Sequence, residues 1–192
     1  LCAWRAAGSP TTPDLRRIDT EVHTAEGTAA QRVEVAHAPI YTVESLRVTI
    51  EKTVQMVHGS YTGSSDAFED TSVVSIVKVQ QGDTVYEPGT DYKKTGDKID
   101  WSPMGNEPAT GSTYTAIIHV IASQEPAALD QDGFTVNGAV EGSSILVTYQ
   151  QALPRLDRLC ITQDGAFVWA KGVASESNPK SPAIPETMLA IA

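Results

Sequence analysis

Three aspartates, Asp91, Asp97 and Asp100, lie close together in the middle of the chain. Carboxylates at such spacing can form the acid and base pair of a glycosidase or hold a calcium ion. A glycosidase needs a sugar cleft between carboxyl groups about 5 to 9.5 Å apart, and aspartates in short turns seldom line such a cleft. We therefore expect these carboxylates to accept hydrogen bonds from the backbone amides of their own turns.

A second acidic group, Asp130 and Asp132 followed by Gly133, resembles the start of a calcium-binding loop. Phe134 occupies a position at which the EF-hand pattern requires Asp or Asn. The segment is more typical of a surface turn.

Isolated imidazoles and thiols complete the set of chemically reactive side chains. The four histidines are His23, His37, His58 and His119. They show neither HExxH nor His-x-His spacing, so a zinc site would require residues from distant strands to converge. Cys2 and Cys160 lie too far apart for a CxxC motif, and we expect both to be reduced. Because Cys160 lies between two apolar residues, a buried thiol is expected there, not an activated one.

Other catalytic signatures are also missing from the sequence. It contains no G-x-S-x-G elbow, P-loop or G-x-G-x-x-G motif. A sugar-binding platform could use Trp4, Tyr61 or Tyr86, but aromatic residues make up only 6% of the chain and have core positions open to them. The sequence therefore predicts no catalytic, cofactor-binding or metal-binding residue and no cofactor, and it argues against an enzyme.

The elements that position these residues are predicted to be strands. Gly and Pro contribute 14 and 11 residues, and they separate short runs rich in β-branched residues. Residues 43–57 fit both a helical stripe and a strand, and their Val, Ile and Thr content favours the strand. We expect Asp164 and Gly165 to form a type I′ hairpin turn, with Leu159, Ile161, Phe167 and Trp169 on one face of the hairpin.

This pattern divides the chain into four segments. Residues 1–30 are read as an extended N-terminal segment anchored by Leu15 and Ile18, and residues 31–150 as an antiparallel β-sandwich with an immunoglobulin-like or fibronectin-like meander. Residues 151–173 form a hairpin segment, and residues 174–192 a Pro-rich linker or polyproline II arm that leads to further sequence. The predicted core of the meander is Tyr92, Ile99, Trp101, Tyr114, Ile117 and Val120.

The balance of charge restricts the possible partners. A formal net charge of −10 disfavours binding to nucleic acid or to anionic membranes, because such contacts need clustered Lys and Arg. No apolar run approaches the roughly 18 residues that span a bilayer, so membrane insertion is not expected.

Two sets of motifs carry a resemblance to a known class of proteins. The sequences YEPGTDY at 86–92, DKIDW at 97–101 and GSTY at 111–114 resemble a repeated module of tailed-phage structural proteins. The sequences LPRLDRL at 153–159 and DGAFVWAKG at 164–172 resemble the segment on the C-terminal side of that module in large phage tail and baseplate proteins. Together the similar regions cover residues 32–192, and residues 1–30 are poorly covered.

The resemblance implies a structural virion protein at the baseplate or the tail-fibre attachment region, assembled in the host cytoplasm. Its expected partners are copies of itself, with a trimer as one candidate, and other tail or baseplate proteins. The alternative is an adhesin-like or carbohydrate-binding module, whose loops, such as residues 59–70, would recognise a glycan on the host surface.

Overall fold

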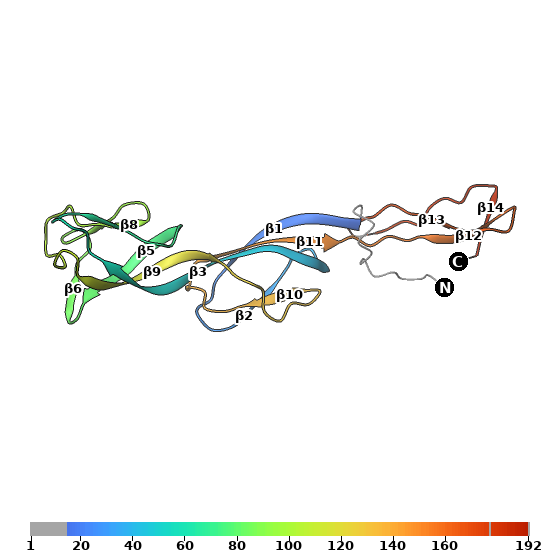
Figure 1. The fold of residues 1–192 in the computed structure, drawn as a ribbon. Coiled ribbons are helices and arrows are strands. Elements are labelled where there is room, and N and C mark those ends of the chain that lie inside the picture. The colour runs from blue at the N-terminus through green and yellow to red at the C-terminus, as the bar shows by residue number, and fades with distance from the viewer. Residues whose placement is uncertain (1–14, 177, 192) are drawn as a thin grey trace.

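The computed structural model describes residues 15–176 and 178–191, and these residues form antiparallel β-strands. The strands are β1 (Arg16–Thr24), β2 (Gln31–Glu34), β3 (Ile40–Val57), β4 (Ser65–Ala67), β5 (Val73–Gln81), β6 (Thr84–Tyr86), β7 (Lys93–Lys94), β8 (Lys98–Asp100), β9 (Thr113–Ser123), β10 (Gly133–Val136), β11 (Ser144–Ala152), β12 (Arg158–Thr162), β13 (Phe167–Ala170) and β14 (Met188–Ala190). The all-β antiparallel class predicted from composition is confirmed. Figure 1 shows an elongated molecule, in which a broad body (residues 15–152) continues into a thin arm (residues 153–191).

One long sheet organises the body. Its strand order is β1-β11-β3-β9-β5-β6, and it curls along its length. The 18-residue strand β3 is its spine: residues 40–48 of β3 pair with β11, and residues 47–57 pair with β9. The strand predicted over residues 43–57 is therefore confirmed and extended. Because β3 belongs to both halves of the sheet, it joins them mechanically.

Two hydrophobic cores lie along this sheet, each covered by a small sheet. The pair β10-β2 places Val33, Phe134 and Val136 against Leu46 and Val48 of β3. The sheet β4-β8-β7 and its loops cover a second core, which is centred on Trp101. Ile50 of β3 packs against both cores, so the cores adjoin.

This arrangement differs from the predicted meander. A meander pairs strands that follow one another in the chain and would place β9 beside β8, but β9 lies in the main sheet between β3 and β5. There the 11 residues of β9 form long hydrogen-bonded ladders with the strands on both of its edges. The three-residue β8 could form only a short ladder with it. The main sheet thus carries both cores, and small separate sheets stand where a sandwich would have a second large sheet.

Most of the predicted core is confirmed. Tyr92, Ile99, Trp101, Tyr114 and Val120 are all buried. The inclusion of Ile117 was wrong, because the alternation of β9 that begins at Tyr114 turns Ala116, Ile118 and Val120 inward and leaves Ile117 only partly buried.

The N-terminal region is more ordered than the sequence indicated. Residues 16–24 form β1, which pairs with β11 over nine positions. Ile18, expected to be an anchor, is 65% exposed, because β1 turns its polar side chains toward the body. Residues 1–14, with Cys2 and Trp4, lie outside the described residues.

The arm contains the predicted hairpin and one more strand. Strands β12 and β13 pair around Asp164 and Gly165, and β14 pairs with the other edge of β12. The turn is not type I′: Gly165, with φ of 81°, is left-handed, but Asp164 is not, and Gly165 N donates to Thr162 O at 3.0 Å. This is the pattern of a three-residue hairpin loop. Residues 174–192, which were predicted to be a linker or an extended arm, therefore contribute strand β14 to the sheet of the hairpin.

Candidate functional site

The aspartates of the middle segment accept hydrogen bonds from backbone amides. Asp91 accepts hydrogen bonds from Glu87 N at 2.8 Å and Asn106 N at 2.7 Å, and Asp100 accepts one from Ser102 N at 2.9 Å. The turn role predicted for these two residues is confirmed. The Ser102 bond lowers the pKa of Asp100.

Asp97 has a different role from the one expected. Its carboxylate accepts from Ser72 N at 3.1 Å and Val73 N at 2.9 Å, so it holds the start of β5 and not its own turn. A partner 24 residues away in sequence could not be inferred from turn composition.

The calcium-like segment is a surface turn. Asp130 Oδ1 accepts from the amides of Asp132 and Gly133 at 2.9 and 3.0 Å, and its carboxylate binds the Arg32 guanidinium at 2.6 and 2.7 Å. Arg32 and these amides lower the pKa of Asp130. Its oxygens are therefore engaged by the protein itself.

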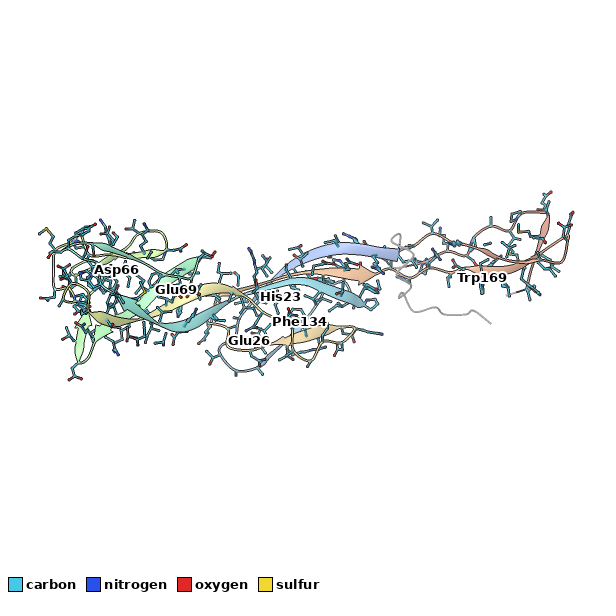
Figure 2. All side chains as sticks on the ribbon, viewed as in Figure 1. His23, Glu26, Asp66, Glu69, Phe134 and Trp169 are labelled. Carbon is cyan, nitrogen blue, oxygen red and sulfur yellow. The ribbon has the colours of Figure 1, made fainter. Side chains whose placement is uncertain are left out.

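A buried polar network at Asp66 was not anticipated from the sequence. Asp66 Oδ2 accepts hydrogen bonds from His58 Nδ1 at 3.0 Å, Trp101 Nε1 at 2.8 Å and the Tyr114 hydroxyl at 2.8 Å, while Oδ1 accepts from Gly59 N at 2.9 Å. These donors lie up to 48 residues away in the sequence. Figure 2 labels Asp66 at the crowded end of the body.

The network stabilises a charged carboxylate inside a core. Burial raises the pKa of Asp66, but hydrogen bonds from His58, Tyr114, Trp101 and Gly59 outweigh it, and the pKa lies below its usual value. Burial and the Asp66 charge raise the pKa of the Tyr114 hydroxyl, which stays protonated and donates. The aromatic rings of His58 and Tyr114 meet Trp101 edge-on, at centroid distances of 5.4 and 5.5 Å. Asp66 is 6% exposed, is enclosed by aromatic rings and has both carboxylate oxygens occupied, so the network fits a structural role.

Two of the aromatic residues considered for a sugar platform lie in different surroundings. Tyr86 is 4% exposed and packs its ring against Trp101, whereas Tyr61 is 65% exposed on the loop before β4. Trp4 falls among the residues that are not described. A stacked pair of exposed aromatic rings is therefore not formed by Tyr61 and Tyr86.

One mixed cluster has the residue types of a cation site. Asp19, Glu21 and His37 each offer a ligand atom, and these atoms lie within 4.8 Å of one another. The sequence did not predict this cluster, because His37 comes from the connection between β2 and β3 while both carboxylates come from β1.

One face of the arm carries exposed apolar side chains. The register pairs Leu159 with Trp169, Ile161 with Phe167 and Ile161 with Leu189. Residues directly opposite in antiparallel strands share a face, so these five side chains form one apolar surface, which we term the arm face. The shared face predicted for the hairpin is confirmed, and Leu189 adds to it. Trp169, labelled on the arm in Figure 2, is 47% exposed, and Phe167 and Leu189 are each 69% exposed.

The arm has almost no core of its own. Among residues 153–176 and 178–191, Cys160 alone is buried, as predicted for that thiol. Small three-stranded sheets need a packed hydrophobic face for stability. Exposed apolar surface concentrated on one sheet face is typical of a surface that binds another protein.

Charge also separates the arm from the body. Residues 153–192 contain four basic and four acidic residues, whereas residues 1–152 contain ten basic and twenty acidic residues. The net charge of −10 therefore belongs to residues 1–152. Copies of the chain would repel one another through their bodies and not through their arms.

A family model described as a domain of unknown function, DUF4815, matches residues 7–192. The chain belongs to the DUF4815 family. No curated protein and no solved structure shows significant similarity to it.

Membership of DUF4815 assigns no activity to the chain. The match runs through both the body and the arm, so the arm is part of the family domain. Within the described residues of this DUF4815 chain, no helix is long and apolar enough to cross a membrane.

Proposed function

We propose that this DUF4815 domain is a structural component of a tailed-bacteriophage virion, located at the baseplate or the tail-fibre attachment region, where it acts as an oligomeric scaffold and docking module. The observation that carries the proposal is the uncovered arm face. The resemblance of residues 86–114 and 153–172 to phage tail proteins supports the assignment to a virion.

In this proposal the body is a rigid spacer. Strand β3 runs through both halves of the main sheet, and two cores fix the small sheets to it. A continuous hydrogen-bonded strand transmits position along the molecule better than two domains joined by a flexible linker would. No catalytic chemistry or cofactor is needed for this role.

The arm supplies the contact in this proposal, and its occupant is the arm of another copy. The neutral arm lets like chains approach, and burying the arm face against an equivalent face would remove Phe167, Trp169 and Leu189 from water together. Other tail or baseplate proteins would then contact the body, whose acidic charge disfavours nucleic acid as a partner.

Immunogold labelling of intact phage particles tests the proposal. An antibody against this chain should label particles of the source lysate at the tail tip or the fibre base. Unlabelled particles, with the antigen free in solution, would contradict a virion role. A glycan array would then examine host recognition, with the exposed Tyr61 loop as the first segment to replace.

A further inference from the structure

Strand β1 turns its titratable side chains inward. Asp19, Glu21 and His23 alternate along one face and are partly buried, while Ile18 and Val22 on the opposite face are 65% and 66% exposed. This inverts the usual pattern of a half-buried strand, in which apolar residues face the core. Partial burial of two neighbouring carboxylates is unfavourable unless a cation or hydrogen bonds compensate it.

An imidazole from another segment meets these carboxylates. His37 lies in the connection between β2 and β3, and its Nδ1 contacts Asp19 Oδ2 directly and lies 3.9 Å from Glu21 Oε1. One nitrogen and two carboxylate oxygens thus converge from two elements that are well separated in the sequence. Such a set matches the ligands that Zn²⁺ and related first-row divalent cations take in proteins.

Two of the converging atoms have no hydrogen-bond partner within residues 15–176 and 178–191. These atoms, Asp19 Oδ2 and His37 Nδ1, are both shielded from solvent. Their contact has the distance of an ion pair without the directionality of a hydrogen bond. To bind a cation, the two atoms would move apart from this contact, and each would then direct a lone pair at the ion.

Surrounding groups hold the third ligand in place. Glu21 accepts hydrogen bonds from Ala36 N at 3.0 and 3.1 Å and from the Tyr149 hydroxyl, and His23 Nε2 lies 3.1 Å from its Oε2. The Tyr149 hydroxyl also accepts from His37 N at 3.3 Å, so one buried tyrosine contacts both segments. Hydrogen bonds that orient ligands in this way are typical of metal sites.

We propose that Asp19, Glu21 and His37 bind one divalent first-row cation, with Zn²⁺ as the preferred ion and water completing its coordination. Two carboxylates and a neutral imidazole would offset the charge of the ion. The bound cation would fasten β1 to the connection that precedes β3, and it would thereby stiffen the end of the body next to the arm. This proposal is independent of the virion assignment.

Titration with Zn²⁺ alone tests the site. The full chain, free of any polyhistidine tag, is titrated with ZnCl₂ in a non-chelating buffer by isothermal calorimetry. We expect one ion per chain, and at least a tenfold weaker affinity in His37→Asn. His119→Asn is the matched control, because His119 lies 3.5 Å from a single carboxylate, that of Glu51, and should bind Zn²⁺ as the parent chain does. Equal affinities in the two variants, or no binding to the parent chain, would overturn the proposal.

A second variant tests positioning without removing a ligand. Tyr149→Phe keeps the ring in the core and removes only the hydroxyl, which binds Glu21 and the amide of His37, so we expect affinity to fall about tenfold. Near-UV circular dichroism should confirm that each variant is folded. ¹⁵N shifts of His37 on addition of Zn²⁺ should be large in the parent chain and in Tyr149→Phe at saturation. If Zn²⁺ shifts only the other histidines, the ion binds adventitiously and the site is wrong.

Discussion

Trp101 and Trp169 lie on or next to short antiparallel sheets at opposite ends of the molecule, and their surroundings are opposite (Figure 1). Trp101 is fully buried, its indole N–H is bound by Asp66, and its ring meets those of His58, Tyr86, Tyr92 and Tyr114. Trp169 is 47% exposed on the arm face. The first sheet is complete within the chain, and the second presents a surface that another molecule can complete.

The two regions depart from the usual distribution of polarity in opposite ways: the body buries a charged side chain, and the arm exposes apolar ones. The body encloses a charged carboxylate because five hydrogen bonds from within the chain compensate its burial. The arm exposes apolar side chains because its three strands are too few to enclose them. Stability of the folded monomer should therefore depend on the body, and association should depend on the arm.

The largest difference in stability is expected between the truncations of the two tryptophans. Trp101→Ala should lower the free energy of unfolding by about 3 to 5 kcal/mol, because it leaves a cavity and frees a buried hydrogen-bond acceptor. Trp169→Ala should change it by less than about 0.5 kcal/mol, as is usual for exposed positions. Urea denaturation of the monomer followed by circular dichroism measures both. Similar losses in the two variants would show that the arm and the body fold as one unit.

Asp66→Asn should have the next largest effect. The amide is nearly isosteric, but it leaves some of the donors from His58, Trp101 and Tyr114 unsatisfied, so a loss of about 3 kcal/mol at pH 7 is expected. An unchanged unfolding free energy would mean that the network is maintained by shape alone.

The same variant predicts the pH dependence. Because the pKa of Asp66 is lower in the folded state than the unfolded value of about 3.9, its stabilisation is present above that value and is lost as the pH falls through the folded pKa. The unfolding free energy of the parent chain should decline below about pH 4, and the decline should be shallower in Asp66→Asn. Equal slopes in the two proteins would contradict this account.

How far the sequence predicts these two regions depends on the range of the interactions. The β-branched run of β3 and the Asp-Gly turn are local signals. The strand over residues 43–57 was predicted from the first, and the hairpin of the arm from the second. Asp66 was not found, because its partners Trp101 and Tyr114 lie 35 and 48 residues away and no spacing rule connects them. Strand β1 was missed because its outward residues, Ile18 and Val22, are the apolar ones.

The arm face and the Asp19, Glu21 and His37 cluster also differ in how much of them local sequence predicts. The arm face was predicted from the alternation of residues 159–161 and 167–169, although its exposure was not, since alternation does not say whether anything covers a face. The Asp19, Glu21 and His37 cluster depends on where the connection between β2 and β3 lies, and there His37 N donates a hydrogen bond to the hydroxyl of Tyr149, 112 residues away. Tertiary contacts therefore supply what the local pattern lacks.

A smaller effect, on association alone, is expected from the arm face. Trp169→Ser combined with Leu189→Ser should weaken self-association at least tenfold, about 1.4 kcal/mol, while the monomer keeps its thermal midpoint. Sedimentation velocity over a range of concentrations measures the association. Val173→Ser is the control, because Val173 is an 81% exposed arm residue outside the arm face. If the control weakens association equally, or if the parent chain is monomeric throughout, copies of the chain do not meet through this face.

The smallest effect is expected from Cys160→Ala. This change removes the one buried side chain of the described arm and should cost about 1 kcal/mol or less, because little apolar volume is lost. Since the arm and the body have separate packing, the cost should appear as faster hydrogen exchange in β12 and β13 while the amides of β9 keep their protection. Hydrogen exchange measured by mass spectrometry resolves the two regions. Equal acceleration in β9 would show that the arm is part of the body's cooperative unit, and the contrast between Trp101 and Trp169 would then describe exposure and not independent stability.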